Sequence, residues 1–347
     1  MNPWVMFILI ASLGLGTTIT FASSHWLLAW MGLEINTLAI IPLMAQHHHP
    51  RAIEATTKYF LTQAAAAALM LFATTSNAWM LGEWHILQLS HPLTATVTMV
   101  SLGMKVGLAP THLWLPEVLQ GLDLTTGLIL STWQKLAPMT LIYQLAANID
   151  PTVLLLIGTT SALVGGWGGL NQTQLRKILA YSSIAHMGWM MIVLKYSPNL
   201  MLLNLVIYII MTSAAFMTLK VVSATSVNTL AIAWTKAPTM ITITMLTMLS
   251  LGGLPPLSGF MPKWMILQEL TKQDLPATAT IMALAALLSL FFYLRLCYNM
   301  ALTSGPNTTN NKSPWRLKTT ITTPLPLMAT VSLTMLPITP AAMALLT

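Results

Sequence analysis

Long apolar runs of about 20 residues recur along the whole chain and limit its fold more than any other feature. A helix of about 20 residues crosses about 30 Å of hydrocarbon. Only 7% of the residues are charged, whereas a soluble globular domain carries about 25%. The strands of a membrane barrel would alternate apolar and polar residues, and these runs are continuous. The sequence therefore predicts an all-α polytopic membrane protein and argues against a soluble enzyme or a disordered chain.

Breaks that contain polar residues or proline divide the apolar runs into about 11 predicted transmembrane helices. Most have the length of one crossing, whereas the fourth and ninth are longer and are interrupted by proline. The predicted spans are 3–22, 25–45, 59–80, 93–122, 124–146, 149–170, 175–194, 199–219, 238–275, 276–298 and 323–346.

The two interrupted spans share the same ingredients: glycines, prolines and a lysine, at 101–117 and again at 252–263. Within a membrane, a broken helix is tolerated only where it is buried in protein or lines a wet cavity. Because the breaks lie an odd number of spans apart, they predict inverted five-helix repeats with two discontinuous helices. The repeats would cover about 1–146 and 149–298 of a single transmembrane domain, followed by a final helix at 323–346. Two ordinary proline kinks are the alternative.

Basic residues in the loops and near the ends of the spans are distributed unequally between the two sides of the membrane. Internal loops of membrane proteins are enriched in Lys and Arg, so the asymmetry predicts an N-terminus on the internal side. The net charge of +7 then reflects this orientation. The sequence contains no basic run interleaved with aromatic residues, so it does not indicate binding to nucleic acid. The N-terminal side collects Arg51, Lys58, Arg176, Lys177, Lys220, Lys236, Arg295, Lys312, Arg316 and Lys318, and the other side collects Lys195 and Lys272.

Four ionisable residues lie near the middle of predicted spans: Glu34, Lys105, Lys135 and Lys263. A charge at the bilayer centre costs at least about 2.5–3.5 kcal/mol. One carboxylate cannot neutralise three lysines, so at least one lysine must be hydrated or neutral. Structural ion pairing is one interpretation, and proton or cation handling is the one that we favour.

Two histidines are further candidates for proton relay. His112 lies between Pro110 and Pro116 in the first break, where it could carry protons near neutral pH or cap the freed carbonyls. His186 follows Ser182 by four residues, on the same face of a helix. That polar stripe faces either a wet axis or a neighbouring helix, and we favour the axis.

Motifs for redox cofactors and metals are missing from the sequence. The single cysteine, Cys297, allows neither a disulfide within the chain nor an iron–sulfur cluster held by this chain alone. No phosphate-binding loop and no HExxH motif occur. We therefore expect no cofactor and no metal bound by this chain. Three glycine pairs predict close helix packing instead: Gly14 and Gly16, Gly103 and Gly107, and Gly165 and Gly169.

Five segments resemble the chain 2 family of NADH–ubiquinone oxidoreductase, antiporter-like subunits in the membrane arm of respiratory complex I. They are residues 23–36, the break at 105–117, STWQKLAP at 131–138, LAYSSIAHMG at 179–188 and the break at 252–263. The resemblance implies proton translocation coupled to electron transfer from NADH to ubiquinone. It places NADH, FMN, the iron–sulfur clusters and ubiquinone in other subunits.

The same resemblance implies a location and partners. The chain would lie in the mitochondrial inner membrane, with its basic loops and N-terminus on the matrix side. Its partners would be membrane lipids and other membrane-arm subunits, including neighbouring antiporter-like ones, and no nucleic acid. Longer family members have three additional helices at the start, so roles assigned to those helices are not transferred.

Four residues match functional positions of the family. Glu34 corresponds to the pairing glutamate, Lys105 to the lysine of the first broken helix, Lys135 to the connecting lysine and Lys263 to the lysine of the second broken helix. In the family, the first two form a pair whose strength sets the proton affinity of the lysine. Two other functions stay open: a stand-alone cation/proton antiporter, and a passive scaffold in which the lysines only pair structurally.

Overall fold

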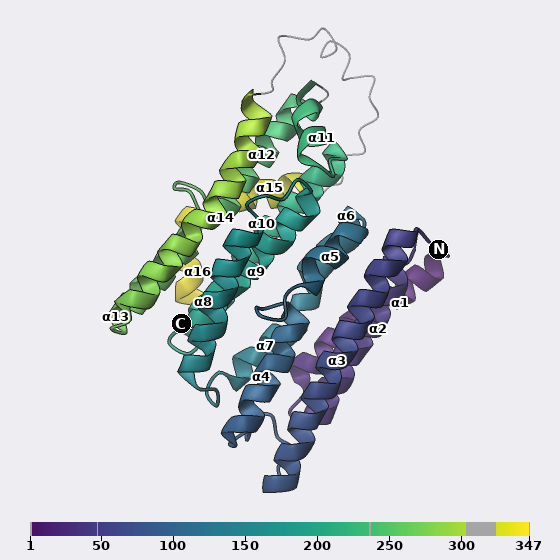
Figure 1. Ribbon diagram of the computed structural model, residues 1–347, viewed down its shortest axis with the longest axis vertical. Coiled ribbons are helices and arrows are strands. Elements are labelled where there is room, and N and C mark those ends of the chain that lie inside the picture. Colours follow the sequence, from purple (N-terminus) through teal and green to yellow (C-terminus); the bar gives the residue numbers. More distant parts are fainter. Residues whose placement is uncertain (1, 47, 236, 303–323, 347) are drawn as a thin grey trace. The chain divides into compact units, whose positions relative to one another are not determined.

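The computed structural model describes residues 2–46, 48–235, 237–302 and 324–346 (Figure 1). Within these residues the regular structure is helical, which confirms the predicted all-α class. The chain divides into two compact units, Met1–Thr160 and Ser161–Thr347. The predicted repeats, 1–146 and 149–298, divide the chain at a similar place, and their inverted relation stays a prediction.

Seven helices and the start of an eighth lie within the described residues of the first unit. They are α1 (Pro3–Ala22), α2 (Trp26–Met44), α3 (Pro50–Leu81), α4 (Pro92–Val106), α5 (Trp114–Gly121), α6 (Leu124–Ser131), α7 (Trp133–Leu145) and the beginning of α8 (Pro151–Gly168). Helix α3 packs against α2, α4 and α5, and α7 packs against α4 and α1. These contacts bring the first predicted break to the inside of the unit.

The second unit holds the end of α8 and the remaining helices. They are α9 (Leu175–Val193), α10 (Pro198–Val222), α11 (Val227–Ile232), α12 (Pro238–Gly252), α13 (Phe260–Lys272), α14 (Pro276–Leu302), α15 (Pro324–Thr334) and α16 (Thr339–Leu346), with short 3-10 turns at Ala233–Thr235 and Leu336–Ile338. Helix α10 packs against α9, α12 and α15, and α12 also packs against α14. The basic residues Lys236, Lys312, Arg316 and Lys318 lie outside the described residues.

Half of the α-helices in the described residues begin at a proline. Pro3, Pro50 and Pro92 each occupy the first turn of a helix, where the missing N–H has no intrahelical partner to lose. Side chains also cap some of these ends: Asn2 accepts the N–H of Trp4 at 3.2 Å. The helix boundaries therefore follow from local chemistry that can be read in the sequence.

Six helices of the described chain are each long and apolar enough to cross a membrane: α1, α2, α3, α8, α10 and α14. A bent pair, Pro324–Thr334 with Leu336–Ala344, forms a seventh candidate. The other four predicted spans fall on helices outside this set: 93–122 on α4 and α5, 124–146 on α6 and α7, 175–194 on α9, and 238–275 on α12 and α13. Every predicted span thus falls on helical segments.

The predicted span at 124–146 is divided into two helices by a single residue. Helix α6 ends at Ser131 and α7 begins at Trp133, with Thr132 between them at φ −112° and ψ −69°. The hydroxyls of Ser131 and Thr132 both donate to the carbonyl of Leu128, at 3.1 and 2.7 Å. Such side-chain bonds to the preceding turn compete with helical geometry and bend helices.

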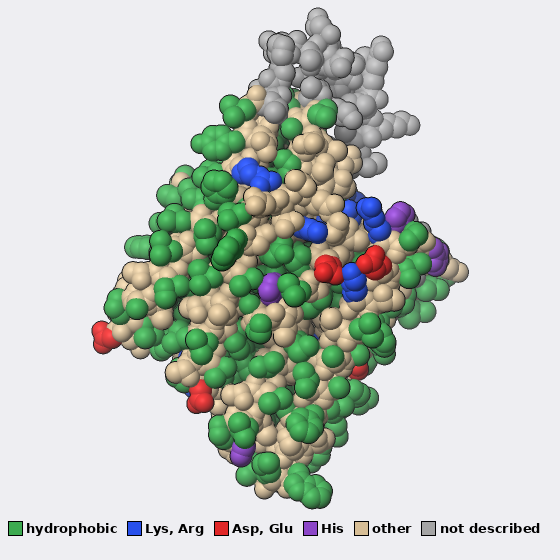
Figure 2. Space-filling model, viewed as in Figure 1, with side chains coloured by type: hydrophobic (Ala, Val, Ile, Leu, Met, Phe, Trp, Pro, Cys, Tyr) green, Lys and Arg blue, Asp and Glu red, His purple; other side chains and the backbone are tan. Residues whose placement is uncertain are grey.

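Apolar side chains cover much of the surface. Figure 2 shows hydrophobic residues over most of the visible face, with few charged groups among them. On α1, for example, Trp4, Phe7 and Leu15 are all exposed. A surface of this kind suits lipid rather than water as the outer solvent.

Candidate functional site

Lys105 lies at the end of α4, where the first predicted break begins. Gly107 ends the helix with φ at +88°, a conformation that residues with a side chain rarely adopt. The N–H groups of Gly107 and Leu108 both donate to the carbonyl of Gly103 at 2.9 Å. The Lys105 side chain is buried, at 8% exposed, and its Nζ has no hydrogen-bond partner in the described part of the chain.

Trp114, the first residue of α5, satisfies a carbonyl that the break leaves free. Its indole Nε1 donates to the carbonyl of Met104 at 3.0 Å. Its ring also meets Tyr59 of α3 edge-on, with 5.7 Å between the ring centroids. The broken helix is therefore closed by protein groups, as a break at membrane depth requires.

His112 lies inside the same break. Its Nδ1 is 3.2 Å from the carbonyl oxygen of Pro110, so an N–H on that nitrogen donates to the backbone. This bond supports the capping interpretation, and His112 is not among the residues that line the cavity described below. The relay role of His112 stays a prediction.

Lys135 lies in the first turn of α7, directly after the break at Thr132. Its side chain is buried, at 3% exposed. Two neighbours fix this turn to other helices: Gln134 Nε2 donates to the carbonyl of Asn36 at 3.3 Å, and Trp133 Nε1 to the carbonyl of Leu13 at 3.5 Å. The position of Lys135 is thus set by α1 and α2 as well as by its own helix.

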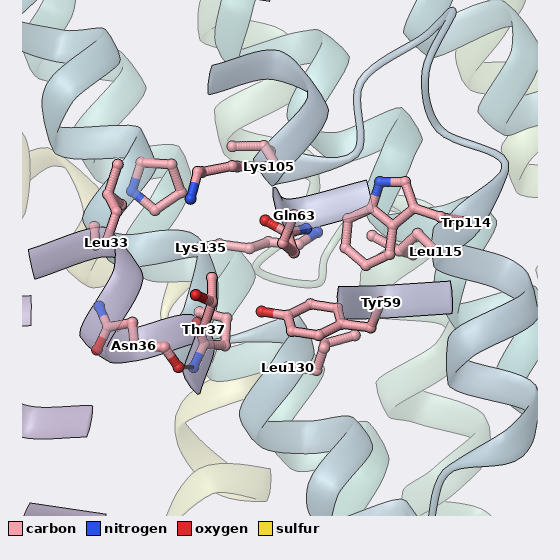
Figure 3. Close-up of a pocket in the computed structure, with 14 residues that line it drawn as sticks. Leu33, Asn36, Thr37, Tyr59, Gln63, Lys105, Trp114, Leu115, Leu130 and Lys135 are labelled. Atoms are coloured by element: carbon pink, nitrogen blue, oxygen red, sulfur yellow. Dashed lines mark hydrogen bonds between the residues drawn. The ribbon is translucent and has the colours of Figure 1, made fainter. Parts of the chain in front are cut away.

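Lys105 and Lys135 line one internal cavity, although they belong to different helices. The cavity has a volume of about 20 Å³, which is room for about one water molecule. Polar side chains complete its wall, and in Figure 3 the amide of Gln63 and the hydroxyls of Tyr59 and Thr37 point toward the space between the helices. These lining polar residues are Asn36, Thr37, Tyr59, Gln63 and Gln134.

Glu34 does not form an ion pair with Lys105 in this structure, although both residues are described. Its carboxylate Oε2 instead accepts a hydrogen bond from Thr37 Oγ1 at 2.6 Å. Thr37 lines the cavity and Glu34 does not. In this structure the partner of the Glu34 carboxylate is the Thr37 hydroxyl, and the Glu34–Lys105 pair stays a prediction.

A second, smaller cavity lies in the second unit, and Lys263 and His186 both line it. Its volume is about 10 Å³, the lower limit for one water molecule. Lys263 Nζ donates to the carbonyl of Gly252 at 2.7 Å. The wall also contains Ser182, so both polar residues of the stripe on α9 line this cavity, and a wet axis there stays a prediction.

The two breaks have the same backbone pattern but carry their lysines at different places. Gly253, like Gly107, is left-handed (φ +82°), and its N–H donates four residues back, to the carbonyl of Leu249. Aligned on these glycines, Lys105 precedes the first break, whereas Lys263 follows the second, at the position that Glu117 occupies in the first unit. The two lysines are therefore not equivalent members of a repeat.

Comparisons with known proteins identify the family. The description "NADH:quinone oxidoreductase/Mrp antiporter, TM" matches residues 23–289, and "NADH dehydrogenase subunit 2 C-terminus" matches residues 290–343. A protein of Carassius auratus named NADH-ubiquinone oxidoreductase chain 2 is 70% identical over all of both chains, and one of Salmo salar with the same name is 68% identical, again over all of both. This chain belongs to the NADH-ubiquinone oxidoreductase chain 2 family.

Solved structures agree with this assignment. A chain of respiratory complex I from Thermus thermophilus, solved with bound aureothin, is similar at a TM-score of 0.86 and 25% identity, over 100% of this chain and 81% of that one. A chain of the Mrp complex from Dietzia sp. shares the fold at a TM-score of 0.77 and 17% identity, over 86% of this chain and 61% of that one.

No group of three His, Cys, Asp or Glu side chains within the described ranges is arranged to hold a metal ion. The polar groups that line the two cavities include amines, hydroxyls, amides and one imidazole. These groups can bind water and hold or pass a proton.

The sequence analysis missed the neutral polar residues of the first cavity. Tyr59 and Gln63 are four apart on α3 and share a face, and both are buried within an apolar helix. Uncharged polar residues at that spacing inside a membrane span are a usable signal.

Proposed function

We propose that this chain translocates protons across the mitochondrial inner membrane as a core membrane subunit of NADH:ubiquinone oxidoreductase, respiratory complex I. One observation carries the proposal: Lys105 and Lys135 are buried in a unit of apolar helices and line one cavity of water size. Ionisable groups held at membrane depth cost free energy. A folded scaffold would be more stable without them, so their presence supports a role in moving charge.

The four charged residues have separate roles in this proposal. Lys105 and Lys135 exchange a proton across the cavity that they share. Lys263 and His186 hold and pass a proton in the second unit, where both line a cavity. Glu34 sets the proton affinity of Lys105 by approaching it or withdrawing to Thr37. His112 is a possible relay only if its ring leaves the carbonyl of Pro110.

Electron transfer belongs to other subunits of the complex in this proposal. NADH, FMN, iron–sulfur clusters and ubiquinone bind there, and this chain binds no cofactor of its own. Its partners are membrane lipids and other membrane-arm subunits, including neighbouring antiporter-like subunits. Its N-terminus lies on the matrix side, a placement supported by the basic residues on that side of the predicted topology.

The test is proton pumping by complexes that carry Lys135→Met or Lys263→Met. We expect fewer protons moved per NADH oxidised, with the complex assembled, because the substitutions remove charges that the membrane disfavours. Lys272→Met is the matched control, because Lys272 is exposed and pairs only loosely with Glu269 at 3.8 Å. An unchanged ratio of protons to NADH in both buried-lysine variants would contradict the proposal.

A stand-alone cation/proton antiporter is a second candidate, because the matching family description includes Mrp antiporters. Co-purification separates the two. A subunit of complex I remains with an NADH-oxidising, flavin-containing particle after mild detergent extraction, whereas an antiporter does not. A passive scaffold would instead keep a normal ratio of protons to NADH in the lysine variants that assemble.

A further inference from the structure

We infer that Ser258 is a positioning residue for Lys263, because it holds the second break against the C-terminal helix α15 through a hydrogen bond to the carbonyl of Ser332. The inference rests on the proposed function, in which Lys263 holds and passes a proton, and it extends that function to how the lysine is kept in place. It also gives a role to α15, a helix that carries no ionisable side chain.

A side-chain hydrogen bond joins the second break to α15. The hydroxyl of Ser258 donates to the carbonyl of Ser332. The two residues are 1% and 0% exposed, so the bond is shielded from water and is stronger for it. Ser332 lies in the last turn of α15, which ends at Thr334, and a helix leaves its last four carbonyls without a donor of its own. The Ser258 hydroxyl therefore satisfies a carbonyl at the end of α15.

Lys263 closes the other side of the same break. It is in the first turn of α13, and its Nζ reaches back to the carbonyl of Gly252, the last residue of α12, at 2.7 Å. The helical donor to that carbonyl would come from Pro256, which has no N–H. The amine of Lys263 thus takes the place of the missing donor. It can do so only while the start of α13 stays close to the end of α12.

Two contacts fix the place where α13 starts. Gly259, the residue before α13, packs so closely on α12 that a Cβ atom there would overlap the carbonyl oxygen of Ser250. Its neighbour Ser258 is held on α15 by the bond to Ser332. Helix α15 packs in turn against α10 and α12 (Figure 1). Loss of the Ser258 bond frees this connection to move away from α15, and the start of α13 moves with it.

The bond also joins two parts of the chain that match different family descriptions. Ser258 lies in residues 23–289, whose description includes Mrp antiporters, whereas Ser332 lies in residues 290–343, whose description names subunit 2 alone. The position of Lys263 therefore depends on a part of the chain that the antiporter description does not include.

The experiment compares four variants in the intact complex: Ser258→Ala, Ser258→Thr, Ser332→Ala and a double variant of Ser258→Ala with Lys263→Met. Ser258→Ala removes the donor, and Ser258→Thr keeps a hydroxyl. Ser332→Ala is the matched control, because it removes a buried hydroxyl that donates within its own helix, to the carbonyl of Ala329 at 2.8 Å, and keeps the backbone carbonyl. Assembled complex, NADH oxidation, protons moved per NADH and the thermal midpoint are measured for each.

We expect Ser258→Ala to lower the number of protons moved per NADH while the complex assembles, Ser258→Thr to restore it, and Ser332→Ala to match the wild type. The double variant should pump as Lys263→Met does alone, because a residue that acts through this lysine has no effect once the lysine is gone. Density maps of Ser258→Ala should show Lys263 Nζ beyond hydrogen-bond distance from the carbonyl of Gly252.

A purely structural bond would give a different result. Ser258→Ala would then lower the thermal midpoint and leave the ratio of protons to NADH normal, which overturns the inference. A further loss of pumping in the double variant also overturns it, because Ser258 would then act on a group other than Lys263. If Ser258→Ala does not assemble, Ser258→Cys replaces it, since a thiol is a much weaker donor. A normal ratio in that variant overturns the inference in the same way.

Failure of this inference is distinguishable from failure of the proposed function. If Lys263→Met reduces pumping and Ser258→Ala does not, Lys263 carries protons without the help of α15, and only the inference fails. If neither Lys263→Met nor Lys135→Met affects pumping, the proposed function itself is wrong.

Discussion

Gly16 of α1 and Gly32 of α2 bring the backbones of their helices into direct contact. A Cβ on Gly16 would lie 2.8 Å from the carbonyl oxygen of Gly32, and a Cβ on Gly32 would lie 2.9 Å from that of Gly16. Because backbone atoms on both sides form this contact, neither can move aside like a flexible side chain. The crossing places Asn36, one turn after Gly32, against α1 and in the wall of the first cavity.

This contact predicts that Gly16→Ala destabilises the protein by about 1–3 kcal/mol, the usual cost of overpacking. Gly14→Ala is the matched control, because nothing lies within 4 Å of a Cβ at Gly14, and alanine stabilises a helix relative to glycine. Thermal denaturation of the complex should show a lower midpoint for Gly16→Ala only. Equal midpoints for the two variants would mean that the helices separate without cost.

Trp114→Phe should destabilise the first broken helix by about 1–3 kcal/mol, because the carbonyl of Met104 loses its buried donor. Glu117→Gln, on the same short helix, should have a smaller effect that disappears at high salt. Glu117 pairs with Lys58 at 2.8 Å, but both side chains are substantially exposed, and exposed pairs contribute little. Denaturation midpoints at low and high salt test both statements, and a larger effect from Glu117→Gln would contradict this order.

The sequence predicts the fold class, the spans and the two broken helices because these depend on local features. Apolar runs mark the helices, and prolines and glycines mark where helices end. Interactions between segments are harder to predict. Gly103 and Gly107 were expected to pack against another helix, and Gly107 does so, because a Cβ there would lie 2.8 Å from Leu115 Cδ1 of α5. That Gly107 also ends α4 in a left-handed conformation was not predicted. Gly165 does pack on the backbone of Ala185, as predicted.

The sequence likewise predicts some residues of the candidate site but not how they are brought together. Charged residues at membrane depth stand out in a chain of this composition, so Lys105, Lys135 and Lys263 could be selected by position alone. The cavity that Lys105 and Lys135 share could not be predicted, because the spacing of two lysines on separate helices depends on how those helices cross. Gln63 was missed for the same reason: a neutral amide is informative only when its neighbours are known.

The orientation of α3 gives a prediction about labelling. Because α3 runs unbroken from Pro50 to Leu81, Arg51 and Glu83 lie near its opposite ends. If basic residues mark the matrix side, Glu83→Cys should react with an impermeant maleimide applied to intact inner membranes, and Arg51→Cys should react only after permeabilisation. The native Cys297 is buried, which keeps the background low. The reverse pattern of labelling would place the N-terminus on the other side.

The last prediction concerns which group is the partner of the Glu34 carboxylate, the Thr37 hydroxyl or the Lys105 amine. The Thr37 hydroxyl donates to the Glu34 carboxylate at 2.6 Å, and a hydrogen bond to a charged group contributes about 1.5–3 kcal/mol. Thr37→Val removes this donor at nearly constant volume. We therefore expect the carboxylate to shift toward Lys105, by a factor of about 10 or more in population.

Density maps of the assembled complex measure this shift as the distance from the Glu34 carboxylate to Lys105 Nζ. It should fall within ion-pair range in Thr37→Val, and proton pumping per NADH should fall too, because a pair held closed keeps its proton on Lys105. Thr56→Val is the control: its hydroxyl donates only to the carbonyl of Ile53, at 2.7 Å. If the carboxylate stays away from Lys105 in Thr37→Val, then Thr37 is not what holds the pair open, and a switch between these two partners is excluded.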